Sequence, residues 1–190
     1  MSNKGYSNKR THTCGQARLG DVDETITLNG WIESIRDHGG LTFIDLRDRY
    51  GLTHVVLDPE LGYGGVLEQL RVEFVLAVTG TVRARPEGMR NSKLDTGDIE
   101  LVATEVEILN PSEVPPFEIA ESKEDPGEDI RLKYRYLDLR RRRIQKNMIF
   151  RSRGTRIIRE VLEEHDFLDL ETPFLTRSTP EGARDFLVPS

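Results

Sequence analysis

The sequence predicts an all-β barrel of five strands, followed by the start of an α+β domain. In the first half of the chain, short stretches alternate apolar and polar residues and are separated by turn-forming residues. A stretch rich in proline and acidic residues then interrupts this pattern. Beyond it, apolar residues recur with the three-and-four spacing of one helical face. A chain of 190 residues is long enough for two small domains.

Five strands are predicted by the alternating stretches at residues 25–35, 41–47, 52–57, 74–85 and 99–109. The turn-forming sequences DHGG and RYG separate the first three of them. Residues 65–71 (GVLEQLR) predict a short helix between the third and fourth strands. Five strands with one helix inserted at this point form the OB arrangement. We therefore expect an OB barrel over residues 1–110.

The second half of the chain predicts a hinge and then a long helix. Residues 111–131 carry four prolines and several acids without apolar periodicity, which is typical of a linker. In the helix beyond it, Gly154 costs about 1 kcal/mol relative to alanine. Residues 167–173 (FLDLETP) indicate an extended segment that begins a sheet. Because a strand needs partners for its backbone polar groups, we expect more protein to follow residue 190.

The composition excludes several classes of protein. Hydrophobic residues make up 36% and charged residues 32%, as in ordinary soluble domains. No apolar run approaches the roughly 20 residues of a bilayer span, and the N-terminus lacks a signal peptide, so we expect a cytoplasmic protein without membrane contact. The single Cys14 predicts a buried thiol and no metal cluster. The net charge of -6 conceals four successive arginines at residues 140–143, so RNA stays possible as a partner.

One strand carries an aromatic residue among charged ones. Ile44 and Leu46 can fill the barrel core, which leaves Phe43 on the side of Asp45 and Arg47. An aromatic ring on such a face is a stacking platform for an unpaired base, worth roughly 1 to 3 kcal/mol. Packing of Phe43 under a loop is an equally acceptable interpretation at this point. Arginines near the ends of neighbouring strands add positive charge, although isolated surface arginines are usually only solvated: Arg36, Arg83 and Arg85.

Two residues near the C-terminal end have chemistry that fits a site. Glu181, followed by Gly182 and Ala183, places a carboxylate on an open loop where it could bind a substrate ammonium group. A solvated loop glutamate is the commoner explanation. Pro173 stands where the helical pattern has given way to a strand, and it could be an ordinary helix stop.

Four stretches together carry a resemblance to a known family. The runs GWIESIRDHGGLTFIDLRDRYGLTHVVLDP, VTGTVRAR, RLKYRYLDLRR and FLDLETPFLTRSTPEGARDFLVPS occur in this order from residue 30 onward. They resemble the corresponding runs of bacterial aspartyl-tRNA synthetases, which are class II enzymes. The similarity extends from about Arg10 to Ser190. The segment TPEGARDFLVPS is the most specific part, because the related asparagine and lysine enzymes differ there.

The resemblance implies an anticodon-binding role for the barrel. In the family a barrel-face phenylalanine stacks on the anticodon, and Phe43 matches it. The family's other anticodon contacts fall on Arg36, Arg85, Asn91 and Glu100. The sequence departs from the family at Ser34-Ile35, where relatives often carry basic residues, and at His54, where they carry glutamine. His54 is retained as a contact because imidazole can hydrogen-bond to a base or stack on it.

The resemblance also implies roles for residues 132–190, as the beginning of a class II catalytic domain. The long helix and the segment with Pro173 match motif 1, which forms the family's homodimer interface. Glu181 matches a glutamate that takes part in binding L-aspartate. The motif 2 and motif 3 arginines, including the one that grips ATP, lie in sequence that these residues do not include. We therefore expect a truncated aspartate-tRNA ligase, which uses ATP and Mg2+ when complete and is inactive as this chain alone.

Two alternatives stay open at this point. A free-standing tRNA anticodon-binding module would need neither motif 1 nor Glu181, and the coding sequence beyond codon 190 would discriminate it from an enzyme. Asparaginyl specificity is opposed by the EGARDF signature.

A last expectation concerns the choice of tRNA. His38 lies in the DHGG turn, and Gly88 lies in the loop after Arg85. In the bacterial family, a histidine and a small residue at these positions accompany enzymes that accept both tRNA(Asp) and tRNA(Asn). The two anticodons differ only at the third base, so an adaptable ring and a glycine that leaves space should tolerate both. A solvated histidine and an ordinary turn glycine form the alternative.

Overall fold

The computed structural model describes residues 9–120, 125–173 and 175 of the chain. They divide into two compact units, Met1–Tyr134 and Arg135–Ser190. Each unit is described separately below. Within the described residues, none of the helices combines the length and apolar content that a bilayer crossing requires.

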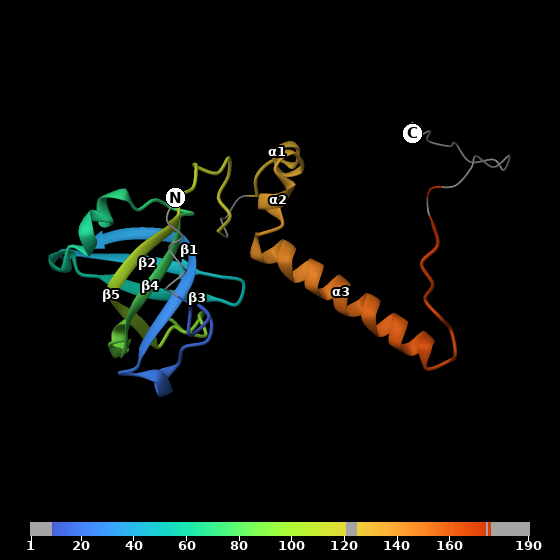
Figure 1. Cartoon of the computed structure of the whole chain (residues 1–190), viewed down its shortest axis with the longest axis horizontal. Helices are drawn as coiled ribbons and strands as arrows, with labels where there is room; N and C mark the ends of the chain where they lie inside the picture. Colours follow the sequence, from blue (N-terminus) through green and yellow to red (C-terminus); the bar gives the residue numbers. More distant parts are fainter. Residues whose placement is uncertain (1–8, 121–124, 174, 176–190) are drawn as a thin grey trace, which may run out of the picture. The chain divides into compact units, whose positions relative to one another are not determined.

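The first unit is a closed five-stranded barrel (Figure 1), which confirms the predicted OB fold. Its order is β1-β2-β3-β5-β4, and the parallel contact between β3 and β5 completes the closure. The other strand pairs are antiparallel. The strands are β1 (Thr25–His38), β2 (Leu41–Arg47), β3 (Leu52–Leu57), β4 (Val75–Ala84) and β5 (Ile99–Asn110).

Alternation along the strands produces the barrel core. Every second residue from Ile26 to Ile32 on β1 is buried, Gly30 included, and Ile44 and Leu46 of β2 are fully buried. Gly30 and Gly80 mark places where backbones approach closely: a Cβ on Gly80 would collide with the carbonyl of Val102 on β5. Only glycine permits this contact between β4 and β5.

The ends of β4 and β5 differ from the predicted ones by one residue, and two larger differences occur elsewhere in the barrel. The first strand runs on to His38, because its ladder with β2 continues to the pair His38 and Leu41. The turn is therefore only Gly39-Gly40, with φ of 60° and 81°, the left-handed region that a tight hairpin needs and glycine supplies. The helix predicted at residues 65–71 is absent. Three 3-10 turns replace it: η2 (Pro59–Leu61), η3 (Tyr63–Gly65) and η4 (Leu67–Gln69). Gly62, which follows η2, and Gly65, the last residue of η3, adopt positive φ and interrupt a continuous α-helix.

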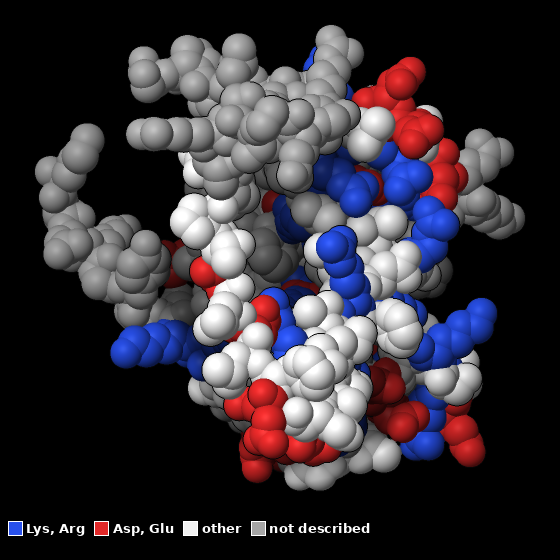
Figure 2. Space-filling view, turned by 90° about the vertical axis from the view of Figure 1, so that its right-hand side faces the viewer, with Lys and Arg blue, Asp and Glu red and all other residues white. Residues whose placement is uncertain are grey.

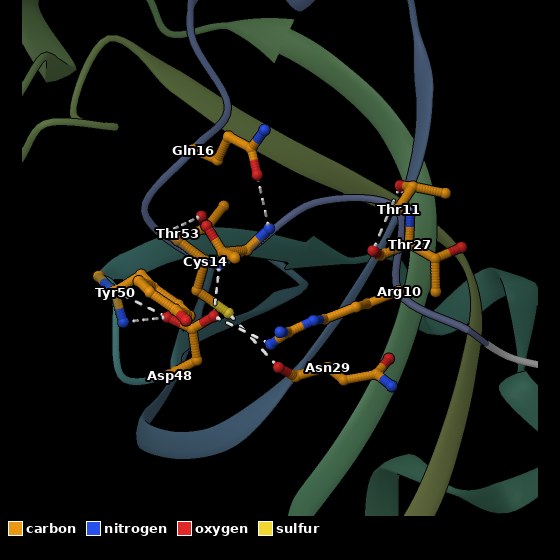
Figure 3. Close-up of polar contacts among 11 residues, drawn as sticks. Arg10, Thr11, Cys14, Gln16, Thr27, Asn29, Asp48, Tyr50 and Thr53 are labelled. Atoms are coloured by element: carbon orange, nitrogen blue, oxygen red, sulfur yellow. Dashed lines mark hydrogen bonds and ion pairs between the residues drawn. The ribbon is translucent and has the colours of Figure 1, made fainter.

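The segment before β1 is hydrogen-bonded to the turn after β2 and to β3 (Figure 3). Asp48, in the turn after β2, accepts hydrogen bonds from the backbone amides of Cys14 (3.0 Å), Tyr50 (2.7 Å) and Gly51 (3.0 Å). Thr53 donates to the carbonyl of Cys14 at 2.6 Å. Cys14 is fully buried, as predicted, and burial followed by the charge of Asp48 raises its thiol pKa. This thiol is therefore a packing group and not a nucleophile.

Among the described residues, three helices follow the barrel: α1 (Glu128–Lys133), α2 (Arg135–Asp138) and α3 (Arg142–Glu163). The long helix passes through Gly154 without a break. A turn at residues 164–166 ends it, with Asp166 at φ 63°. The extended segment expected at residues 167–173 forms no strand. A strand requires a hydrogen-bonding neighbour, and no described residue pairs with this segment.

Candidate nucleic-acid interface

Strand pairing brings three of the predicted contact residues onto one outer face. Arg36 of β1 pairs with Phe43 of β2, and Asp45 of β2 pairs with His54 of β3. Residues paired across a sheet point to the same side. Because Ile44 and Leu46 point into the core, this face, formed by β1, β2 and β3, is the outer one.

Phe43 lies half-buried in this face. Its strand neighbours are Arg36 on one side and Val56 on the other. The Arg36 side chain is 56% exposed, so its guanidinium can meet a phosphate or a base beside the ring. The ring thus has an apolar neighbour on one strand and a cation on the other, the combination that single-strand binders use for stacking.

Asp45 links the polar residues of the same face. One carboxylate oxygen accepts a hydrogen bond from Ser34 (2.5 Å) and one from Arg36 (2.8 Å). The other oxygen contacts Nδ1 of His54. Burial alone would raise the pKa of Asp45, but the hydrogen bonds from His54 and Ser34, with the charges of His54 and Arg36, lower it below its ordinary value. Asp45 is therefore ionised at neutral pH, and its partners are fixed by it.

A second group of predicted contacts lies where β4 and β5 begin their ladder. Arg83 pairs with Glu100 across the strands and donates to it at 2.5 and 2.9 Å. Nε of Arg85 lies 3.9 Å from the same carboxylate. Two Arg85 nitrogens, Nε and Nη1, are buried and meet no hydrogen-bond acceptor among the described residues. The parallel pair of Val55 with Leu101 stands one residue beyond His54 and Glu100, so the two groups adjoin.

Asn91 has a local structural task. Its side-chain oxygen accepts the amide of Lys93 at 3.1 Å, and its backbone amide donates to the carbonyl of Gly97 at 3.0 Å. A Cβ on Gly97 would collide with the carbonyl of Asn91. These contacts hold the loop between β4 and β5 in shape, and they fix the position of Asn91 within it.

The two residues considered for tRNA discrimination lie in the loops that flank the face. His38 is exposed at the β1–β2 hairpin, next to the pair Thr42 and Leu57. Gly88 lies in η5 (Glu87–Met89), within the loop whose Thr96 donates to the carbonyl of Leu52. The loops therefore belong to opposite ends of β3. A Cβ on Gly88 would meet nothing within 4 Å, so the fold itself does not require glycine there.

The sequence did not reveal a buried charge network beside this face. Arg47 contacts Glu73 and, at 3.1 Å, Glu33, and its guanidinium lies 6.0 Å from the Trp31 ring centroid. Arg47 is 7% exposed and Glu73 4% exposed. The sequence does show a charged residue, Arg47, at the end of the alternating pattern of β2. Its partner Glu73 lies 26 residues further along the chain, in the loop before β4. Such long-range pairing is invisible in a single sequence.

Surface charge is mixed and does not form a single basic field in the view of Figure 2, where acidic and basic side chains are interspersed. This distribution agrees with the net charge of -6.

A possible cation cluster lies away from this face, where the sequence predicted no metal. His12, Asp21 and Glu24 bring ligand atoms within 4.8 Å of one another. Asp21 already accepts the amide of Arg18 at 2.7 Å, and Glu24 is exposed. We assign no metal to these residues.

Two site residues were predicted in the second unit, and the structure describes one of them. Pro173 is described and exposed, whereas Glu181 lies outside the described residues. The long helix α3 buries none of its residues within this chain. Its exposed apolar side chains are Met148, Ile149, Phe150, Ile157, Ile158, Val161 and Leu162.

Family models match both parts of the chain. Residues 26–109 match an OB-fold nucleic acid binding domain, and residues 127–190 match the class II tRNA synthetases for D, K and N. Among solved structures, an aspartyl-tRNA synthetase of Entamoeba histolytica aligns with 94% of this chain and 42% of its own, at TM-score 0.75 and 21% identity. An asparaginyl-tRNA synthetase of Pyrococcus horikoshii aligns with 87% and 38%, at TM-score 0.72 and 21% identity. The fold is thus that of a class II synthetase with an attached OB barrel.

Curated relatives narrow this class. The aspartate-tRNA(Asp/Asn) ligase of Ruthia magnifica is 51% identical over 181 residues, which are 95% of this chain and 31% of the relative. The ligase of the same name from Thermotoga maritima is 53% identical over 181 residues, again 95% and 31%. The chain belongs to the aspartyl-tRNA synthetase family and corresponds to about the first 30% of its members' length.

Proposed function

We propose that the barrel binds the anticodon loop of tRNA(Asp), as the front part of an aspartate-tRNA ligase. The observation that carries this proposal is the convergence of Arg36, Phe43 and His54 on one outer face, in a chain about half identical to aspartate-tRNA(Asp/Asn) ligases. Phe43 stacks on an unpaired base, and Arg36 binds next to it. Arg85, Asn91 and Glu100 extend the contact toward the β4–β5 loop. In this proposal the domains are the barrel at 1–110, the hinge at 111–131 and the catalytic part from 132.

The complete enzyme would join L-aspartate to the 3′ end of tRNA with ATP and Mg2+ in the cytoplasm. In this reaction the 190 residues recognise tRNA and form a homodimer contact through α3 and Pro173, whose apolar exposure within one chain supports that role. Glu181 binds the aspartate. In this proposal the phosphate chemistry belongs to the remaining part of the enzyme.

Catalysis provides the first test. The purified 190-residue chain should show no aspartate-dependent exchange of pyrophosphate into ATP, while a full-length ligase that begins with these residues should show it. Exchange by the short chain, with host enzyme excluded, would contradict the assignment of the phosphate chemistry to the remaining part.

The choice of tRNA provides the second test, and it concerns tRNA(Asn) as a further substrate. The relatives named above are ligases for both tRNA(Asp) and tRNA(Asn). A full-length enzyme with this front end should aminoacylate both at comparable rates, and His38→Leu should shift the ratio toward tRNA(Asp). Gly88→Leu, which the open space around Gly88 permits, should act in the same direction. An enzyme that strongly rejects tRNA(Asn) would overturn this part of the proposal.

A further inference from the structure

We propose that Asp45 is a positioning residue that makes Nε2 of His54 a hydrogen-bond acceptor for an N–H group of an anticodon base. The inference rests on the proposed function and deepens it. It assigns a task to Asp45, which the sequence did not single out, and it defines which base groups His54 can recognise.

The first step concerns the proton on the imidazole ring. Nδ1 of His54 contacts a carboxylate oxygen of Asp45. An ionised carboxylate can only accept hydrogen bonds, so Nδ1 must carry the proton. In a neutral imidazole the other nitrogen, Nε2, then has a lone pair and no proton. The neutral ring is therefore an acceptor at Nε2, whereas in the opposite tautomer Nε2 would be a donor.

The second step concerns how firmly Asp45 is held. Ser34 and Arg36, both on β1, donate to the oxygen that His54 does not contact. The carboxylate thus has partners on both of its neighbouring strands and cannot turn away from His54 without losing them. The two positions where the sequence departs from the family, Ser34-Ile35 and His54, therefore meet at this one side chain.

The third step concerns what Nε2 can reach. The His54 side chain is 13% exposed, and Asp45 makes its only recorded polar contact among the described residues. By strand register Glu100 of β5 stands next to His54, and Arg83 of β4 already engages it, while Arg36 of β1 donates to Asp45. An acceptor in this place attracts amino or imino N–H groups of a base and not phosphate, which Arg36 is suited to bind.

The tautomer can be observed directly. We would record ring 15N NMR shifts of the 190-residue chain and identify the His54 signals by their loss in His54→Gln. The signals should show a proton on Nδ1 and none on Nε2. Asp45→Asn should mix the tautomers, because an amide can accept or donate. The matched control is Asp37→Asn, whose carboxylate accepts from Thr42 at 2.8 Å and does not contact His54. A proton on Nε2 in the parent chain would overturn the proposal.

Binding of anticodon stem-loops completes the test. Each anticodon base is replaced in turn by an analogue that lacks its N–H donor. One analogue should weaken binding to the parent about tenfold, which corresponds to 1.4 kcal/mol. In folded Asp45→Asn and His54→Phe the same analogue should cost almost nothing, whereas in Asp37→Asn and His54→Gln it should cost as much as in the parent. If the analogue weakens binding to Asp45→Asn as much as binding to the parent, Asp45 is only structural and the inference is overturned.

The inference and the proposed function can fail separately. If the parent binds the natural stem-loop but no analogue changes its affinity, only the inference is overturned. If the parent binds no anticodon stem-loop, both are overturned.

Discussion

The barrel buries its large apolar side chains, whereas α3 leaves side chains of similar size exposed. In the barrel, alternation along β1 to β5 places large side chains such as Leu28 and Leu46 at 0% exposure. In α3, side chains of similar size such as Ile158 remain 63% exposed. The barrel therefore carries its own hydrophobic stabilisation, whereas α3 leaves apolar surface exposed among the described residues. The division agrees with a recognition module attached to a part that is completed by other contacts.

The largest expected effect separates the two regions by stability. Leu46→Ala should destabilise the barrel by about 2 to 5 kcal/mol, because it leaves a cavity in a closed core. Ile158→Ala shortens a side chain that is 63% exposed and should change stability by less than about 0.5 kcal/mol. Urea unfolding followed by the fluorescence of Trp31, the single tryptophan, measures both. Equal effects of the two substitutions would contradict the comparison.

The barrel was also the region that the sequence predicted best. Strands β2 and β3 have the predicted ends, because turn-forming residues bound them on both sides. The predicted helix at residues 65–71 was wrong. The prediction relied on the spacing of apolar residues and gave too little weight to Gly62 and Gly65, which adopt positive φ. The predicted strand at residues 167–173 was wrong for a different reason. Its pattern describes a segment suited to a sheet, but a single segment cannot form one without a partner.

The candidate site was predictable only in part. Phe43 could be selected because strand parity alone places it outside the core. Asp45 could not be selected, because its three partners come from β1 and β3. Local sequence patterns do not reveal which strands pair or in what register. The roles of Phe43, Arg36 and His54 in RNA binding stay predictions until they are measured.

The second prediction asks whether the barrel face binds RNA. Phe43→Ala should weaken binding to an aspartate anticodon stem-loop by about 1 to 3 kcal/mol, the loss of one stacked base. The dependence of binding on salt should hardly change, because no phosphate contact is removed. Phe43→Tyr keeps an aromatic face and should retain most of the affinity. The matched control on the other region, Phe150→Ala in α3, should bind as well as the parent chain.

If Phe43→Ala is folded and binds with full affinity, the ring is a packing residue. The barrel and α3 would then differ in how they bury apolar residues, but RNA binding by Phe43 would no longer distinguish them.

The third prediction separates the regions by acid sensitivity. The pKa of Asp45 is lower in the folded chain than its ordinary value of 3.8. Its charged form therefore stabilises the fold above that value, and the contribution is lost as the pH falls through the lowered pKa. Asp45→Asn should cost about 1 kcal/mol at pH 7, and this cost should shrink below pH 4.

The control for acid sensitivity is an ion pair of α3. Arg156 and Glu160 lie 3.2 Å apart with side chains 72% and 56% exposed. Such an exposed pair contributes little, so Glu160→Gln should leave urea unfolding of the barrel unchanged at every pH. A cost of Asp45→Asn that grows toward acid would reverse the sign and refute the assignment of Asp45 as an ionised partner.

The smallest effect is expected within α3 itself. Gly154 lies inside this helix, where a Cβ would meet nothing within 4 Å. Gly154→Ala should stabilise the helix by about 1 kcal/mol, because alanine loses less backbone freedom on becoming helical and adds no clash. Amide hydrogen exchange should slow about fivefold around residue 154 and stay unchanged in β1 to β5. The barrel offers the opposite case in Gly80, whose Cβ would strike the carbonyl of Val102. Slower exchange throughout the chain would show that the helix and the barrel open together, so that the two regions are not independent in stability.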